Sequence, residues 1–173
     1  MLDLIKSRVS VKSYSDREVP RELLEQIIEA GIWAPSGRNR QAVRFLVVTN
    51  PETIKILERL NAEAIDMPAG STPFYGAPVV VSVFGDRDIH THVEDASLAL
   101  GNMMNVAHSL GVDSCWVHRA KEMYETDEGR KIAREAGIPD AYIGVGNCIL
   151  GYRKETHNPT PKDRVQGRVH YIK

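Results

Sequence analysis

Residues 92–110 predict a long helix that is apolar on more than one face. Its apolar positions repeat at helical spacing and comprise Val93, Ala96, Ala99, Leu100, Met103, Val106, Ala107 and Leu110. A helix with so wide an apolar surface has to be covered from more than one side. Because the other helical segments are amphipathic, we expect a second copy of the chain to cover the outer face of this helix. The pattern therefore predicts a homodimer.

The rest of the chain alternates between helical and strand patterns. Helical patterns cover residues 2–7, about 20–33, a stretch that begins at 50–51, and about 127–136, while strand patterns cover 43–49, 79–84, 112–117 and 142–152. A chain of 173 residues with 42% hydrophobic content suits a single domain, residues 1–173. We expect an α+β fold, with a mainly antiparallel sheet of about four strands flanked by helices.

Three segments carry further expectations about burial and pairing. Helix 20–33 should bury an apolar stripe made of Leu23, Leu24, Ile27, Ile28 and Ile32. Residues 67–78 hold three prolines and two glycines and should form an exposed loop. Alternating apolar residues in 165–171 predict a final strand that completes the sheet edge of the partner chain.

Composition and motifs exclude several classes of function. A net charge of −1 gives no electrostatic case for nucleic acid or an anionic membrane. Cys115 and Cys148 each lie in an apolar run, which is typical of buried thiols in a reducing compartment, and no apolar run approaches 20 residues, so we expect a cytoplasmic protein. No zinc spacing, nucleophile elbow or Walker loop occurs. The repeat Gly144-Val145-Gly146 lacks the third glycine and the helix of a dinucleotide motif.

Residues 33–41, Trp-Ala-Pro-Ser-Gly-Arg-Asn-Arg-Gln, form a polar stretch between a helix and a strand. Pro35 fixes one backbone angle, Ser36 and Gly37 suit a tight turn, and Asn39 carries an amide that both donates and accepts hydrogen bonds. Such a loop can read the edge of a planar ligand rich in heteroatoms. An ordinary helix-to-strand turn is the alternative.

Basic residues gather in three other places. Alternation puts Arg8, Ser10 and Lys12 on one side of an extended segment, where they can converge on one anion, although a solvated edge segment has the same pattern. His118 follows a buried strand and adjoins Arg119, a position that often presents ligand groups and that also suits a hydrogen-bonded surface histidine. The tail 159–164, Pro-Thr-Pro-Lys-Asp-Arg, is typical of a basic segment that closes an anion site, and a solvated basic tail is the alternative.

Five of these stretches, residues 8–12, 33–41, 74–78, 114–122 and 151–164, resemble in the same order the motifs of the nitroreductase family. The string Cys-Trp-Val-His-Arg-Ala-Lys-Glu, which begins at Cys115, is similar to the small-subunit branch of that family. The resemblance implies a three-layer α+β fold, a homodimer with an exchanged carboxy-terminal strand, and FMN as cofactor. FAD is less favoured because the chain has no evident adenosine site.

The resemblance also implies the residues of the FMN site. The phosphate, the ribityl chain and the N1 side of the ring would be held by Arg8, Val9, Ser10, Lys12, Lys162 and Arg164. The loop residues Pro35, Ser36, Gly37 and Asn39 would come from the partner, and the strand end Trp116, Val117 and His118 would lie by the flavin. Lys12 is the expected catalytic residue, as the cation next to N1.

The implied activity is a ping-pong transfer of two electrons from NADH or NADPH, through FMN, to a small acceptor such as a nitroaromatic or quinone. The region 62–73 is short compared with family members that carry a larger insertion, which leaves the acceptor undetermined. The same residues would serve a flavin-binding or flavin-handling protein without turnover. A dimeric scaffold without flavin is a third reading, and it requires a protein that stays colourless in FMN.

Overall fold

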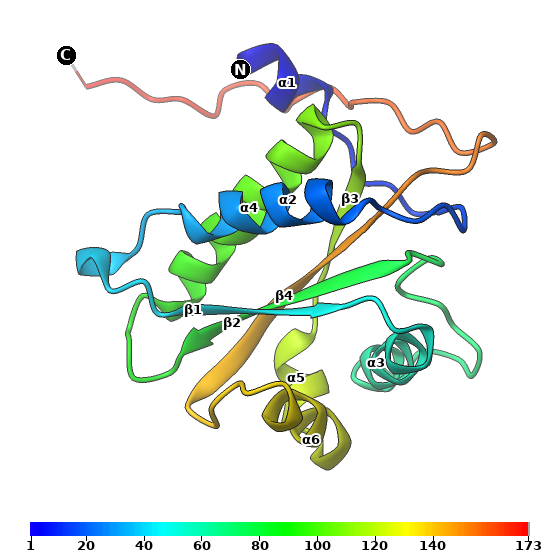
Figure 1. Ribbon diagram of the computed structural model, residues 1–173. Coiled ribbons are helices and arrows are strands. Elements are labelled where there is room, and N and C mark those ends of the chain that lie inside the picture. The colour runs from blue at the N-terminus through cyan, green and yellow to red at the C-terminus, as the bar shows by residue number, and fades with distance from the viewer. Residues whose placement is uncertain (173) are drawn as a thin grey trace.

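A computed structural model describes residues 1–172 of the chain (Figure 1). The helical elements are α1 (Leu2–Ser7), α2 (Arg21–Ile32), the 3-10 turn η1 (Gly37–Asn39), α3 (Pro51–Glu63), α4 (His92–Ser109), α5 (Ala120–Glu125) and α6 (Asp127–Glu135). The strands are β1 (Val43–Val48), β2 (Val79–Asp86), β3 (Asp113–Val117) and β4 (Tyr142–Gly151). These strands form one antiparallel sheet in the order β1-β2-β4-β3, so the α+β prediction with four antiparallel strands is confirmed.

The sheet lies between two layers of helices (Figure 1). Helices α2 and α4 cover one face, and the core there includes Ile27, Leu100 and Met103. Helices α3, α5 and α6 cover the other face, with Leu57 and Met123 in the core. Because both faces of the central strands are buried, β2 is an almost continuous apolar run rather than an alternating one.

Three sequence-based expectations fail locally. Ile32 is 61% exposed, because it is the last residue of α2 and lines an open hollow beside the edge strand β1. Phe74 is buried although it lies in the proline-rich loop, since its N–H donates to the Glu58 carboxylate (2.8 Å) and its ring enters the core. Helix α5, which the sequence patterns did not predict, packs against β4, where Gly144 leaves no room for a Cβ beside the Ala120 carbonyl.

Two further expectations concern a partner chain. Helix α4 buries Leu100 and Met103, while Val93 and Leu98 stay about half exposed. Residues 158–172 carry no strand and run as an extended, mostly exposed arm along the α1 side of the molecule (Figure 1). A strand completed by a second chain therefore remains a prediction.

Candidate functional site

The segment 8–15 is clamped between the edge strand β3 and the chain that follows β4. On the β3 side, Val11 N–H donates to Ser114 O (3.1 Å). On the other side, Ser15 N–H donates to Tyr152 O (2.8 Å), and Lys12 N–H donates to the imidazole Nε2 of His157 (3.1 Å). The polar positions of this short segment are thereby fixed in space by residues more than 100 positions away.

Within the clamp, Arg8, Ser10 and Lys12 all influence the pKa of the Cys115 thiol on the neighbouring strand β3. Burial raises the pKa of Cys115, and a hydrogen bond from Ser10 together with the charges of Lys12 and Arg8 lowers it only in part. In residues 1–172, Arg8 Nη1 is a buried nitrogen without a hydrogen-bond partner. A buried guanidinium nitrogen without an acceptor is costly, so this position is suited to an anion from outside the chain.

Lys12 is exposed, and its Nζ lies 5.9 Å from the centroid of the Tyr75 ring. Tyr75 belongs to the loop before β2, and its own backbone carbonyl accepts a hydrogen bond from Tyr14 N–H (3.1 Å). Val9 is half-buried against the apolar core. Lys12 is therefore positioned over an aromatic ring, on the same segment as Arg8.

An ion pair closes the start of β3. The Asp113 carboxylate accepts from the Arg153 backbone N–H (2.8 Å) and from Arg153 Nε (3.0 Å). Both side chains are largely shielded from solvent. The pair fastens the chain after β4 to β3 and so supports the clamp on residues 8–15.

The loop after α2 has an unusual backbone. Arg38, Asn39 and Gln41 all have φ near +54°, a region that non-glycine residues adopt only when their surroundings hold them there. Gly37 N–H donates to the buried Asp95 carboxylate (3.0 Å), and Gln41 N–H donates to Ser36 Oγ (2.9 Å). Pro35 and Asn39 remain exposed.

Within one chain, the loop after α2 does not lie next to the clamped segment 8–15. The 12 residues of α2 separate residues 8–15 from the loop, and a helix of that length spans about 18 Å. Figure 1 shows the two segments at opposite ends of α2. Lys162 and Arg164 lie on the exposed arm, where Arg164 Nη1 donates to Lys162 O (2.7 Å).

The end of β3 is held by both neighbouring layers. Trp116 packs over Gly146 of β4, where an added Cβ would lie 2.7 Å from Trp116 Cε2 and 2.8 Å from Nε1. His118 is exposed, and Arg119 has φ of +72° and pairs with Glu122 (2.9 Å). A hollow of about 210 Å³ lies beside this strand end and is lined by His92, Val93, His118, Arg119, Lys121, Glu122, Ile143, Gly144 and Val145.

A buried polar chain runs through the sheet to this strand end. The Tyr124 hydroxyl donates to Ser82 Oγ (2.8 Å), which donates to Asn147 Oδ1 (2.7 Å). Asn147 Nδ2 then donates to Val117 O (3.4 Å), and from α3 Asn61 Nδ2 donates to His118 O (2.7 Å). Every polar side chain in this chain of contacts therefore has a partner.

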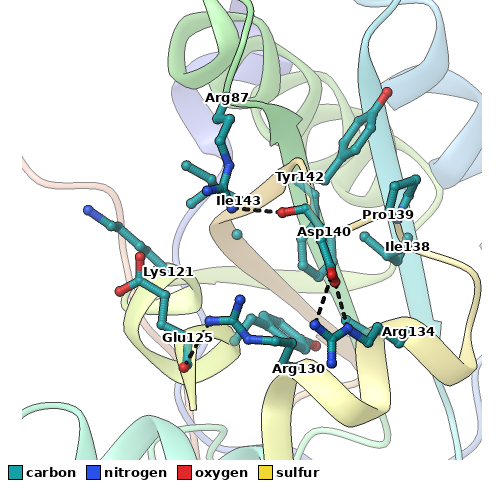
Figure 2. Close-up of a pocket in the computed structure, with 14 residues that line it drawn as sticks. Arg87, Lys121, Glu125, Arg130, Arg134, Ile138, Pro139, Asp140, Tyr142 and Ile143 are labelled. Atoms are coloured by element: carbon teal, nitrogen blue, oxygen red, sulfur yellow. Dashed lines mark hydrogen bonds and ion pairs between the residues drawn. The ribbon is translucent and has the colours of Figure 1, made fainter. Parts of the chain in front are cut away.

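A second polar hollow lies between α6 and the turn before β4 (Figure 2). Arg134 binds the Asp140 carboxylate through two nitrogens (2.6 and 2.8 Å), and Arg87 donates to Asp140 O (2.7 Å). The hydrogen bond from Arg134 is the largest cause that lowers the pKa of the Asp140 carboxyl, and the charges of Arg134, Arg130 and Arg87 lower it further. The arginines tie the turn to α6, so the hollow has a structural role.

Sequence reasoning missed three residues of the site. The His157 imidazole accepts a hydrogen bond from Lys12 N–H, and the Asp95 carboxylate accepts one from Gly37 N–H. The Asn61 amide donates one to His118 O. Only Asn61 and Asp95 carried a signal, since each is a polar residue among the apolar positions of a helix. The contact of His157 depends on how the chain after β4 folds back, which its neighbours in sequence do not encode.

Both cysteines of the chain are free and buried, as predicted. Burial raises the pKa of Cys148 to about 12. Across residues 1–172 no cluster of three or more His, Cys, Asp or Glu side chains is arranged to hold a metal ion. The helices of the same residues include none that is long and apolar enough to cross a membrane.

Residues 5–152 match the family model described as the nitroreductase family. A relative from Methanothermobacter thermautotrophicus, named as a candidate NADH dehydrogenase/NAD(P)H nitroreductase, is 32% identical over 178 residues, which cover 100% of this chain and 87% of the relative. An FMN reductase [NAD(P)H] from Bacillus subtilis is 32% identical over 138 residues, and the match covers 65% of this chain and 52% of that relative.

Two solved structures with similar folds extend this comparison. A nitroreductase with bound FMN from Bacteroides fragilis has a TM-score of 0.92 and 28% identity, and the match covers 99% of this chain and 98% of that one. An FMN-dependent nitroreductase from Clostridium difficile has a TM-score of 0.82 and 27% identity, covering 100% and 99% of the two chains.

Proposed function

Because the chain belongs to the nitroreductase family, we propose that it is an FMN-dependent oxidoreductase that carries two electrons from NADH or NADPH to a small acceptor. Nitroaromatics and quinones are the acceptor classes that we expect. The Bacteroides fragilis structure holds FMN, and the name of the Methanothermobacter relative includes NAD(P)H. FMN, when bound, supplies the two-electron redox chemistry that the side chains of this protein do not have.

The buried, unpartnered Arg8 Nη1 is the observation that carries the proposal. It needs an anionic acceptor, and the FMN phosphate is a dianion with several acceptor oxygens. Ser10 lies on the same segment and provides a hydroxyl. Arg8 and Ser10 therefore fit the phosphate end of FMN, and Lys162 and Arg164 would close the site.

Lys12 would act on the ring. A cation held near the ring stabilises the negative charge that accumulates there on reduction, and so raises the reduction potential. No carboxylate lies within ion-pair distance of Lys12 Nζ in the described chain, so its charge is not neutralised there. Trp116, Val117 and His118 would contact the same ring from the end of β3.

The complete site would need a homodimer. Pro35, Ser36, Gly37 and Asn39 would reach the cofactor from the partner, because α2 separates them from the clamp of their own chain. Within residues 1–172 strand β1 is an unpaired sheet edge. A hollow of about 480 Å³ beside it is lined by Phe45 and Val47 among others, and one of about 1010 Å³ by Val47 and Thr49 among others. The partner's arm, with exposed Val165 and Val169, would pair along this edge.

Lys12→Met tests the activity most directly. The variant keeps much of the side-chain length, so FMN should still bind through its phosphate. Loss of the cation should lower the reduction potential by roughly 20–65 mV, which corresponds to about 1–3 kcal/mol for a two-electron couple. Stopped-flow reduction by NADH and by NADPH, together with a redox titration, measures both effects.

Lys131→Met on α6 serves as the matched control, because Lys131 is exposed and lines neither of the hollows beside β1. An unchanged potential in Lys12→Met would remove Lys12 from the mechanism. A bound flavin that neither nucleotide bleaches would assign the protein to the class that binds flavin without turnover.

A further inference from the structure

The backbone at the end of β3 is oriented by side chains from two other elements. Asn147 on β4 and Asn61 on α3 are 0% and 2% exposed, and their amide groups hold the carbonyls of Val117 and His118. Two successive carbonyls thus point into the interior, at the point where β3 leaves the sheet.

Holding these carbonyls sets the direction of the next two N–H groups. In a trans peptide the N–H of a residue points opposite to the preceding carbonyl. The N–H groups of His118 and Arg119 therefore point away from the interior, and neither has a hydrogen-bond partner within residues 1–172. Segment 8–15 lies along the outer edge of the same strand, where Val11 N–H donates to Ser114 O.

The orientation of the Asn147 amide is fixed by the polar chain behind it. Burial raises the pKa of Tyr124, so its hydroxyl stays protonated and donates to Ser82 Oγ. Ser82 then donates to Asn147 Oδ1, which leaves Nδ2 to face Val117 O. The opposite amide orientation would place a nitrogen against the Ser82 donor and an oxygen against a carbonyl.

The φ angle of +72° at Arg119 is a separate sign that this turn is held in place. A residue with a side chain adopts the left-handed region when its surroundings over-determine the backbone, and such positions cluster at functional sites. Here the interior contacts of residues 117 and 118 supply that constraint.

We propose that Asn61 and Asn147 are positioning residues that keep the His118 and Arg119 N–H groups aligned as a donor pair for the ring of the bound cofactor, with Ser82 and Tyr124 fixing Asn147. This inference rests on the proposed function, because the ring is that of FMN. It assigns a role in the cofactor site to four side chains that lie behind it.

Asn61→Leu in the FMN-loaded protein tests the proposal. The substitution keeps the approximate volume of the side chain and removes the donor to His118 O without adding a charge. The dissociation constant of FMN should rise roughly three- to tenfold, as for the loss of about one neutral hydrogen bond, and the visible absorption maximum and the reduction potential of the flavin should shift. Tyr124→Phe, which removes only a hydroxyl, should give a smaller shift of the same sign.

Asn50→Ala is the matched control, because Asn50 caps the other end of α3 through Thr53 N–H (2.9 Å). It should lower the thermal midpoint to a similar extent and leave the flavin spectrum and potential unchanged. Parent-like FMN affinity and spectrum in Asn61→Leu would overturn the positioning role, as would equal flavin changes in Asn50→Ala. A parent protein that binds no FMN would instead overturn the proposed function itself.

Discussion

Segment 8–15 and the carboxy-terminal arm, residues 158–172, are both expected to reach the FMN phosphate, yet they are held in different ways. The segment has hydrogen bonds to Ser114, Tyr152 and His157, which all lie far away in the sequence. The arm is almost fully exposed, and the hydrogen bonds of Arg164 are to Lys162 and Gln166 of the same arm. One half of the phosphate site is therefore preorganised within a chain, while the other half would depend on a partner.

Deleting residues 160–173 should have the largest effect on the association state and on FMN binding. Without the arm the sheet edge at β1 stays open, so we expect monomers or aggregates and almost no FMN binding. Light scattering coupled to gel filtration measures the association state. The double variant Lys162→Ala, Arg164→Ala is the control, because it should keep the dimer and lose only FMN affinity. A deletion protein that stays a stable dimer would rule out the exchanged strand.

Arg8→Ala tests the preorganised half. Loss of a charged contact to phosphate should cost about 1.5–3 kcal/mol, which raises the FMN dissociation constant roughly ten- to a hundredfold. Fluorescence titration of the apoprotein with FMN gives the constant. Arg17→Ala is a suitable control, since Arg17 is exposed and stacks on Tyr152 at 3.9 Å. Unchanged affinity in Arg8→Ala would mean that the phosphate lies elsewhere.

Asp113→Asn tests what holds the clamp together. Arg153 would lose its ionic partner in a largely shielded place, so the free energy of unfolding should fall by about 1–2 kcal/mol in urea titrations. Asp140→Asn breaks an exposed pair with Arg134 and should cost about 0–1 kcal/mol. An equal decrease in the free energy of unfolding in the two variants would mean that the Asp113–Arg153 pair contributes no more to stability than an exposed ion pair.

The smallest effect is expected from Glu58, which holds the loop that carries Tyr75. Burial raises the pKa of Glu58 above its usual 4.5, and the hydrogen bond from Phe74 N–H offsets this in part. The folded state therefore binds the proton more tightly than the unfolded state, so this contribution to stability is lost as pH rises from about 4.5 through the raised pKa. Unfolding of Glu58→Gln should lack that loss, and its stability relative to the parent should increase with pH across this interval.

The sequence predicted the layers and strands well because their residues repeat with clear periods. Leu24 and Ile27 of α2, and the apolar run of β2, are buried as their spacing indicates. Ile32 has the same spacing but is the last residue of α2 and faces an open hollow beside the edge strand β1, and periodicity does not reveal where the covering residues end. Helix α5 is only six residues long, which is too short for a helical period to be recognised.

The site was predictable where one short motif supplies neighbouring groups, as with Arg8, Ser10 and Lys12. It was not predictable where groups meet through the tertiary fold. Asn61 reaches His118 O across 57 positions of sequence, and His157 reaches Lys12 N–H across 145. Such contacts depend on the register of β3 against β4 and on the path of the chain after β4.

The close contact between Gly146 and Trp116 predicts that substitutions at these two positions are correlated among related chains. A Cβ at 146 would overlap the indole ring, so the two residues share one volume between neighbouring strands. A lineage that gains a larger residue at 146 first has to lose the indole at 116, or rebuild the end of β3. In an alignment of relatives these two columns should therefore change together, with a bulky aromatic at 116 found only beside glycine at 146.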